Sequence, residues 1–510
     1  MNSGLSLRTA KLTSDLAPTP TASTPQSTPD TTTVDLSNAQ NECVRPELLD
    51  ILRYTIDDGM TIDTFQLPTA PGGDPRLRET LSVFFNRYFK PMHHVEAEHI
   101  ALTAGASDAI EHAVHALCDE GDSIIVPGPY WPGFELLVST RAKVNIIIAQ
   151  SPTYTNYTSY LVPSLQAAYD FSPVKKRIKA VLLSNPSNPL GRCYSKSVLI
   201  ECMEFCQERG LHLISDELYA LTDLGHIKKG EEFVSVLSLT EPLMPEGAIK
   251  VDPTRVHVVW SASKLFGVSG LRVGCFVSQQ NPELVKAVAF LTATHTNTIA
   301  SLYLSRLLSL PQLSSLMTLN SERLTTSYRL LAECLRNLKI HFVEPTHGLF
   351  LFAKLTNDLS TLEEEKSYFD RLTAAGLKVS PGRLYRGVDG EFGWARIRFC
   401  IAEDVMTKTI ASFGQIWEPQ CTFLGRLECS VLTSLPQTPQ EHSKASIPHK
   451  MAPPPNSTVQ ILLRYTYRAN MIFFAGFGAW YMLKGPGRGQ EQDIASLTQR
   501  GNDKSTENRE

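Results

Sequence analysis

Residues 256–278 read VHVVWSASKLFGVSGLRVGCFVS, and this stretch begins and ends in a short apolar run. The runs are largely continuous rather than alternating, which is typical of strands whose two faces are both covered by helices. Runs of this kind, separated by helical stretches, lie at Ser123–Val126, Ala180–Leu183, Leu211–Ser215, Val256–Trp260 and Cys275–Ser278. We therefore expect an α/β fold in which helices pack on a mostly parallel sheet.

The turn between the last two runs carries an amine and an arginine. Lys264 comes shortly after a strand, Ser261 and Ser263 precede it, and Arg272 follows it by eight residues. Such an amine suits Schiff-base chemistry with a carbonyl cofactor, and the hydroxyls with the guanidinium suit a phosphate monoester. Taken alone, the segment is explained equally well by an exposed lysine in a glycine-rich turn.

Polar groups also follow two other predicted strands. Asp216, in ISDELY, stands at a strand end, where a buried carboxylate needs a partner such as a protonated ring nitrogen. Asn188, in NPSNPLG, follows another strand, and its amide can donate to a phenolate oxygen on the same ring. Tyr219, three residues after Asp216, can donate to that oxygen as well. These groups favour a planar cofactor that contains a ring nitrogen.

Two further segments complete this pattern. Thr103–Ser107, TAGAS, precedes a helical stretch that begins near Asp108, so its backbone N–H groups and the helix dipole favour an anion. Pro127–Phe134, PGPYWPGF, holds Trp131 where its ring could stack on another planar ring. A core position for Trp131 is the alternative. Each motif is weak by itself, whereas the set points to one phosphate-bearing ring.

Composition limits the class of protein. The 510 residues carry 48 Lys and Arg against 52 Asp and Glu, a net charge of −4, which argues against a nucleic-acid partner. The length exceeds what one core supports, so we expect at least two packed units. The 10 cysteines form no CxxC pair or zinc spacing, and no secretory signal precedes them. We expect reduced thiols, no bound metal and a cytoplasmic location.

Both ends of the chain differ from its centre. Residues 1–33 are rich in Ser, Thr and Pro, which predicts a disordered arm. Residues 418–510 form an extension with one uncharged stretch, ANMIFFAGFGAWYML, at 469–483. A spanning helix needs about 20 apolar residues, so a buried or amphipathic helix is favoured here over membrane contact.

The motifs TAGAS, PYWPGF, NPSNPLG, DELY and SASKLFGVSGLRVG occur in the order found in class I/II pyridoxal-phosphate aminotransferases, which this chain resembles. Within that family, PYWPGFE, HLISDELYA, VSPG and GWARIRF are most similar to the branch of 1-aminocyclopropane-1-carboxylate synthases and their fungal relatives. The resemblance covers about residues 34–417. It implies a fold type I homodimer, with a large cofactor-binding domain at 76–304 and a smaller α/β domain from 34–75 and 305–417.

The resemblance also assigns roles toward pyridoxal 5′-phosphate. It makes Lys264 the lysine that carries the cofactor covalently and Asp216 the partner of the ring nitrogen. Asn188 and Tyr219 would bind the phenolate oxygen, and Tyr219 counts with Lys264 and Asp216 as catalytic. The implied phosphate cup consists of Gly105, Ala106, Ser107, Ser261, Ser263 and Arg272.

Two choices between neighbouring residues stay open in this comparison. Trp131 matches the aromatic that stacks on the ring, with Tyr130 as the alternative. Arg396, in GWARIRF, matches the arginine that holds the substrate α-carboxylate. Arg398 lies on the same face of a strand and could be the ligand instead, or a surface charge.

The expected reaction is transamination of an α-amino acid or amino-acid conjugate in specialised metabolism. The alternative is a lyase, either a carbon–sulfur lyase or an enzyme of cyclising elimination. The family's usual Ala-Glu-Asn reads Ala39-Gln40-Asn41 here, and no tyrosine stands between Tyr54 and Tyr88, which argues against 1-aminocyclopropane-1-carboxylate synthesis. A membrane-tethered or regulatory binding protein without turnover is a third hypothesis, disfavoured because Lys264, Asp216 and Arg272 are all present.

Overall fold

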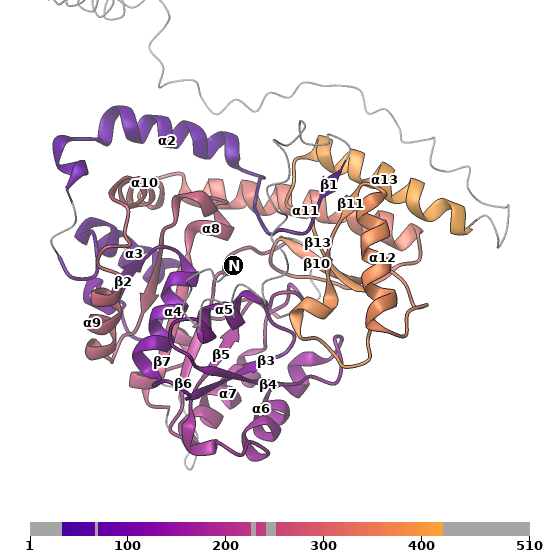
Figure 1. The fold of residues 1–510 in the computed structure, drawn as a ribbon. Coiled ribbons are helices and arrows are strands. Elements are labelled where there is room, and N and C mark those ends of the chain that lie inside the picture. Colours follow the sequence, from indigo (N-terminus) through magenta and orange to yellow (C-terminus); the bar gives the residue numbers. More distant parts are fainter. Residues whose placement is uncertain (1–32, 67–69, 226–230, 241–250, 422–510) are drawn as a thin grey trace, which may run out of the picture. The chain divides into compact units, whose positions relative to one another are not determined.

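The computed structural model describes residues 33–66, 70–225, 231–240 and 251–421. Most of the strands in these ranges belong to one seven-stranded sheet with the order β2-β8-β7-β6-β5-β3-β4 (Figure 1). Its strands are β2 (Ile100–Thr103), β3 (Ser123–Pro127), β4 (Asn145–Ala149), β5 (Ile178–Ser184), β6 (His212–Asp216), β7 (Val256–Ser261) and β8 (Gly274–Val277). All five predicted strands are present, so the α/β class is confirmed.

Four of the six strand pairings in this sheet are parallel, and β8 alone runs antiparallel to its neighbours β7 and β2. The predicted strand bounds differ from the observed ones by one or two residues. Sequence analysis missed the two edge strands β2 and β4. β4 carries two exposed residues and so lacks the buried pattern that identified the others. β2 is fully buried, and neither its burial nor its length of four residues separates it from β8.

Helices cover both faces of the sheet, which is why its central strands are continuously apolar. Along β5, Ala180 and Leu182 belong to one core, whereas Val181 and Leu183 belong to the other. The first core includes α4 (Ala106–Leu117), α5 (Gly133–Ser139) and α9 (Pro282–Leu291). The second includes α3 (Pro75–Tyr88), α6 (Leu161–Asp170), α7 (Lys196–Glu208) and α10 (Thr298–Leu308).

A second, antiparallel sheet has the order β12-β13-β10-β9 and its own apolar core. Its strands are β9 (His341–Val343), β10 (Phe350–Lys354), β12 (Ser380–Pro381) and β13 (Trp394–Arg398). Figure 1 shows it with α11 (Leu313–Asn337), α12 (Leu362–Ala374) and α13 (Glu403–Cys421). The short strand β1 (Val34–Asp35) pairs with β11 (Leu377–Lys378), so the start of the described chain joins this region before α2 (Arg45–Gly59) begins. The numerical domain bounds remain a prediction.

The ends of the chain fall largely outside the described residues. This holds for residues 1–32 of the predicted arm and for the apolar stretch 469–483. Helix α13 continues to Cys421, past the predicted end of the folded region at Trp417. Within the described ranges, no helix combines the length and apolar character needed to cross a membrane.

The topology brings the predicted strand-end groups together. Strands β5, β6 and β7 are parallel neighbours, and they end at Ser184, Asp216 and Ser261. The carboxyl ends of parallel strands meet at one edge of a sheet, where α/β proteins bind ligands. The register places Ser184 directly beside Asp216 at this edge.

Candidate active site

A cavity of about 380 Å³ lies where this edge faces the second sheet. Segments from both sheets and from the N-terminal part of the described chain line it. Of the predicted site residues, the described lining contains Ala106, Ser107, Trp131, Asn188, Asp216, Tyr219, Ser263, Lys264, Arg272 and Arg396.

Lys264 lies in the one-turn helix α8 (Ala262–Leu265), directly after β7. Its Nζ donates a hydrogen bond to the Ala39 carbonyl at 2.7 Å and lies 6.0 Å from the centroid of the Tyr219 ring. Burial, with the positive charge of Arg396, lowers the pKa of Lys264 to about 8. A lysine with such a pKa supplies far more neutral, nucleophilic amine at neutral pH than an exposed lysine does.

Asp216 ends β6 and faces the same cavity. Its carboxylate accepts hydrogen bonds from the Ser184 hydroxyl at 3.1 Å and from the Leu218 N–H at 3.3 Å. Burial nevertheless raises the pKa of Asp216 to about 6. A cationic ring nitrogen beside this carboxylate would offset the burial cost, so Asp216 fits the predicted cofactor.

Glu217 is also fully buried, but it is absent from the described lining of the cavity. Its Oε1 accepts hydrogen bonds from the Ser215 hydroxyl at 3.1 Å and from the Val236 N–H at 2.9 Å. Its Oε2 finds no hydrogen-bond partner within the described ranges, and burial raises the pKa of Glu217 to about 8. The two neighbouring carboxyl groups therefore differ in role: Asp216 faces the site, and Glu217 is held neutral behind it.

The N-terminus of α4 forms one end of the cavity. Gly105 precedes the helix with φ +89°, and Ala106 and Ser107 of the first turn line the cavity. Arg272, in left-handed backbone conformation, donates from Nη2 to the Ala104 carbonyl at 2.7 Å. Free N–H groups of a helix N-terminus beside a guanidinium are well suited to a phosphate.

Ser261 and Gly105 are not among the described lining residues of the cavity, but each contacts a residue that is. The Ser261 side chain accepts from the Ser263 N–H, and the two hydroxyl oxygens lie 2.7 Å apart. Ser263 itself faces the cavity. A Cβ on Gly105 would lie 2.8 Å from Arg272 Nη2, so the glycine lets the guanidinium approach the loop.

Sequence analysis missed a cluster that holds this loop. Asp108 accepts from the Ala104 N–H at 2.8 Å and from His295 Nδ1 at 2.9 Å, and His112 Nδ1 lies 3.2 Å from the same carboxylate. Burial opposes ionisation, but these hydrogen bonds outweigh it and lower the pKa of Asp108 to about 2. His112 Nδ1 also contacts the Asp108 carbonyl at 2.8 Å, which can only accept, so that nitrogen carries a proton and is not a free metal ligand.

Arg396 forms the opposite end of the cavity. Nη1 donates to Asn188 Oδ1 at 2.9 Å and Nη2 donates to the Ser37 carbonyl at 2.7 Å, while Nε is buried without a hydrogen-bond partner among the described residues. The guanidinium carbon lies 4.7 Å from the centroid of the Phe350 ring and 5.3 Å from that of Tyr385. Arg396 thus lines the cavity with a guanidinium held by two hydrogen bonds, and its planar fork is suited to a carboxylate. Asn188 keeps its amide nitrogen as a donor, because Arg396 occupies its oxygen.

The structure separates the two aromatic candidates. Trp131 lines the cavity. Tyr130 is buried behind it, where its hydroxyl donates to Glu135 at 3.1 Å and its N–H donates to the Tyr385 carbonyl at 2.8 Å. The geometry therefore favours Trp131 as the stacking ring.

Some lining residues were not predicted. Ser37, Asn38 and Ala39 come from the segment between β1 and α2, and Ser380 and Tyr385 from the second sheet and the turn after it. The VSPG motif at 379–382 marked the neighbourhood of Ser380 without assigning it a role. The first three residues contribute partly through backbone carbonyls, which leave no signal in a sequence.

Comparison with known proteins agrees with this geometry. The family model described as aminotransferase class I and II matches residues 39–413. The chain is 35% identical over 371 residues to a probable aminotransferase, aclI, of Aspergillus oryzae, a match that covers 72% of this chain and 87% of the relative. It is 30% identical to 1-aminocyclopropane-1-carboxylate synthase 7 of Arabidopsis thaliana, over 63% of this chain and 71% of that protein.

Solved structures agree as well. A single mutant of the aspartate aminotransferase of Thermus thermophilus superposes with a TM-score of 0.61 and 25% identity, covering 75% of this chain and 91% of the other.

Proposed function

Because this chain belongs to the class I and II aminotransferase family, we propose that it is a pyridoxal-phosphate-dependent aminotransferase that acts on an α-amino acid or amino-acid conjugate. The resemblance of its motifs to fungal relatives supports a substrate of specialised metabolism. The homodimer and cytoplasmic location expected from the sequence are part of this proposal.

One observation carries the proposal: a single cavity holds an amine of lowered pKa, a buried carboxylate and an arginine with an unused N–H. These groups are Lys264, Asp216 and Arg396. A protein that binds a ligand without turnover does not need a nucleophilic amine in the same cavity as this carboxylate and this arginine.

The proposed roles follow from the chemistry of each group. Pyridoxal phosphate, when bound, supplies an electron sink for the bond that breaks at the substrate Cα. Asp216 would hold a proton at the ring nitrogen, and Asn188 and Tyr219 would donate to the phenolate oxygen. Trp131 would stack on the ring, and the α4 N-terminus with Ser263 and Arg272 would bind the phosphate.

The substrate is oriented from the other end of the cavity. Arg396 would bind the α-carboxylate through its planar fork of N–H groups. The Lys264 amine would then take the proton from Cα as a general base and return it at a new position. The orientation that Arg396 imposes decides which bond at Cα is broken.

A lyase is the second candidate, and the 30% identity to 1-aminocyclopropane-1-carboxylate synthase 7 favours it. Both reactions begin with removal of the Cα proton by the same amine. They differ in whether the nitrogen stays with the enzyme or leaves with the product.

A single-turnover experiment tests the proposal. Purified full-length protein is mixed with a panel of amino acids and cysteine conjugates, and keto acid, ammonia and thiol are quantified. A stoichiometric keto acid without ammonia supports an aminotransferase. Release of ammonia or thiol identifies a lyase instead, and protein without any bound cofactor favours the binding-protein hypothesis.

A further inference from the structure

The segment Ser37–Glu42, called the strap below, crosses the cavity between β1 and α2. Two of its backbone carbonyls accept hydrogen bonds from two cationic groups of the site: Ser37 from Arg396 Nη2 and Ala39 from Lys264 Nζ, each at 2.7 Å. Ser37, Asn38 and Ala39 line the cavity. The position of the strap therefore decides how much room the substrate has beside Lys264 and Arg396.

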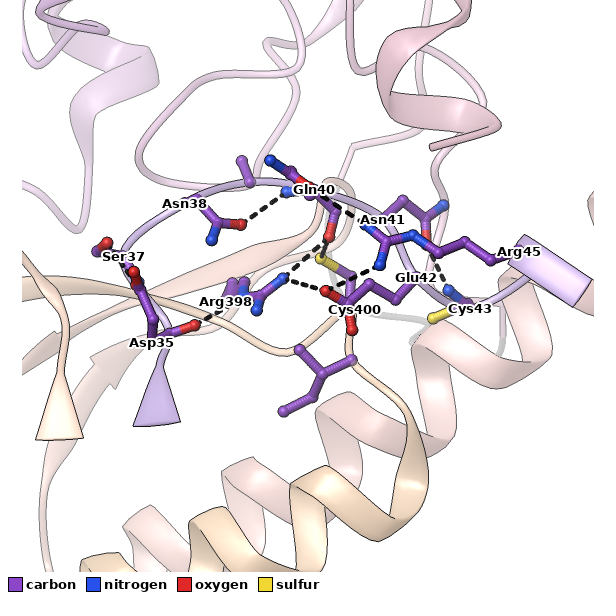
Figure 2. Close-up of polar contacts among 12 residues, drawn as sticks. Asp35, Ser37, Asn38, Gln40, Asn41, Glu42, Cys43, Arg45, Arg398 and Cys400 are labelled. Atoms are coloured by element: carbon purple, nitrogen blue, oxygen red, sulfur yellow. Dashed lines mark hydrogen bonds and ion pairs between the residues drawn. The ribbon is translucent and has the colours of Figure 1, made fainter. Parts of the chain in front are cut away.

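Arg398 holds both ends of the strap (Figure 2). Its Nε donates to the Asp35 carbonyl at 3.1 Å, just before the strap begins. Its Nη1 donates to the Gln40 carbonyl at 3.3 Å and to Glu42 Oε1 at 2.9 Å, at the other end. The Arg398 residue is only 8% exposed, so water competes poorly for these hydrogen bonds.

Further contacts fix the same segment against β13 and α8. The Glu42 N–H donates to the Cys400 carbonyl at 3.0 Å, and Cys400 Sγ contacts the Gln40 carbonyl at 3.0 Å (Figure 2). Asn41 Nδ2 donates to the carbonyls of Lys264 and Leu265 at 3.1 Å. The strap is thus tied to the backbone of the catalytic lysine itself.

Arg396 and Arg398 divide two tasks between them. They are two residues apart on β13, but only Arg396 belongs to the described lining of the cavity. Within the described ranges, the side-chain hydrogen bonds of Arg398 go to the strap and to Asp35, two residues before it. Its partner Glu42 also lies 3.4 Å from Arg45 at the start of α2, so the carboxylate links β13 to that helix.

We propose that Arg398 and Glu42 form a clasp that positions the strap, and that Arg398 is a positioning residue which does not contact the substrate. The inference rests on the proposed function of the site. The clasp keeps the Ser37 and Ala39 carbonyls in place as acceptors for Arg396 and for the Lys264 amine whenever that amine is free.

Hydrogen exchange of the full-length, cofactor-loaded protein tests the clasp directly. Arg398→Lys keeps the charge but loses the planar fork, and Glu42→Gln keeps the shape but loses the charge. Both should speed exchange in peptides that cover residues 34–44, by about tenfold, and raise KM more than they lower kcat, because misplacement of a positioning segment weakens substrate binding. The matched control is Glu391→Gln, which removes an ion pair to Lys354 in the same region and should leave exchange at 34–44 unchanged.

A double variant and a substrate comparison sharpen the test. If the two side chains act as one unit, Arg398→Lys with Glu42→Gln should be little worse than either single change. Arg398→Lys should also preserve the preference for an amino acid over its α-amide, whereas Arg396→Lys should reduce that preference.

Two results would overturn the inference. Unchanged exchange at 34–44 in both Arg398→Lys and Glu42→Gln would show that the clasp does not hold the strap. Loss of the acid-over-amide preference in Arg398→Lys would make that arginine the carboxylate ligand. The exchange measurement needs no turnover, so a failure of the proposed function is distinguishable from a failure of the clasp.

Discussion

At the scale of single residues, two adjacent carboxyl groups show how position decides chemistry. Asp216 and Glu217 are both buried, and burial raises the pKa of each. Only Asp216 faces the cavity, because neighbouring residues near a strand end point to opposite sides. The same physical effect therefore prepares one group for a cationic partner and keeps the other neutral.

This difference predicts opposite outcomes for two conservative changes. Asp216→Asn removes the charge that holds a ring proton, so kcat should fall by about 100-fold or more. Glu217→Gln replaces a carboxyl group that is mostly protonated at pH 7 by an amide of the same shape, so kcat should stay within about twofold. Steady-state kinetics of both variants measures kcat, and an equal loss of kcat in the two would contradict the different roles assigned to Asp216 and Glu217.

The lowered pKa of Lys264 predicts the pH dependence of cofactor attachment. The protonated amine is not nucleophilic, so attachment of pyridoxal phosphate to the cofactor-free protein should quicken as pH rises toward the pKa of about 8. It should level off above pH 8, well below the value near 10.4 of an exposed lysine. Borohydride reduction at timed intervals, read by mass spectrometry, measures the rate.

Lys264→Ala is the control for that experiment and should show no attached cofactor at any pH. If the rate of attachment kept increasing up to pH 10, Lys264 would instead behave as an exposed lysine in a glycine-rich turn.

At the scale of elements, the sequence motifs act through helix starts and strand ends. The glycine before α4 has a positive φ and leaves room for Arg272, and the Asp108 cluster fixes the loop from behind. Both arginines of strand β13 contact the strap, but only Arg396 belongs to the described lining of the cavity. Because residues two apart on a strand share a face, strand periodicity alone does not distinguish the tasks of Arg396 and Arg398.

Gly105→Ala should weaken cofactor binding by about tenfold, because its Cβ would displace the Arg272 guanidinium and the positive φ of +89° is strained for alanine. Gly390→Ala is the matched control, since φ is +76° there but the added Cβ meets no described heavy atom within 4 Å. Both changes should lower the free energy of unfolding by about 1–2 kcal/mol. Titration of the cofactor-free proteins with pyridoxal phosphate separates them, and equal losses of affinity would show that backbone strain alone is responsible.

At the scale of the whole folded region, the site joins the two sheets. Arg396 on β13 donates to Asn188, which follows β5, and Lys264 after β7 donates to Ala39 of the strap. The ion pair between Arg386 and Glu135, at 2.6 Å, adds a further link between the two regions. A ligand in the cavity therefore contacts groups that both sheets position.

Cofactor binding should accordingly stabilise the described region as one unit. At free pyridoxal phosphate about 100 times its dissociation constant, the expected gain is about 2.7 kcal/mol, seen as a single thermal transition moved to higher temperature. Calorimetry of loaded and cofactor-free protein measures the shift. Two transitions of which only one moves would confine the site to one sheet.

The features that could be predicted from the sequence are those that depend on residues close together in the chain. Continuous apolar runs identified the central strands, because both faces of each strand are buried in separate cores. The polar residues after those runs converge because parallel strands end at one edge, so most of the residues that line this part of the cavity were identified from motifs. The edge strand β4 escaped, since its exposed residues interrupt the apolar pattern.

The tertiary structure decided what depends on contacts between distant segments. Ala39 lies 225 residues before Lys264 in the chain, and it takes part through a carbonyl that every residue possesses. The separate tasks of Arg396 and Arg398, and the placement of Trp131 rather than Tyr130 in the cavity, follow from which neighbours surround each side chain. Local sequence specifies which groups are available, whereas packing specifies which of them face the same space.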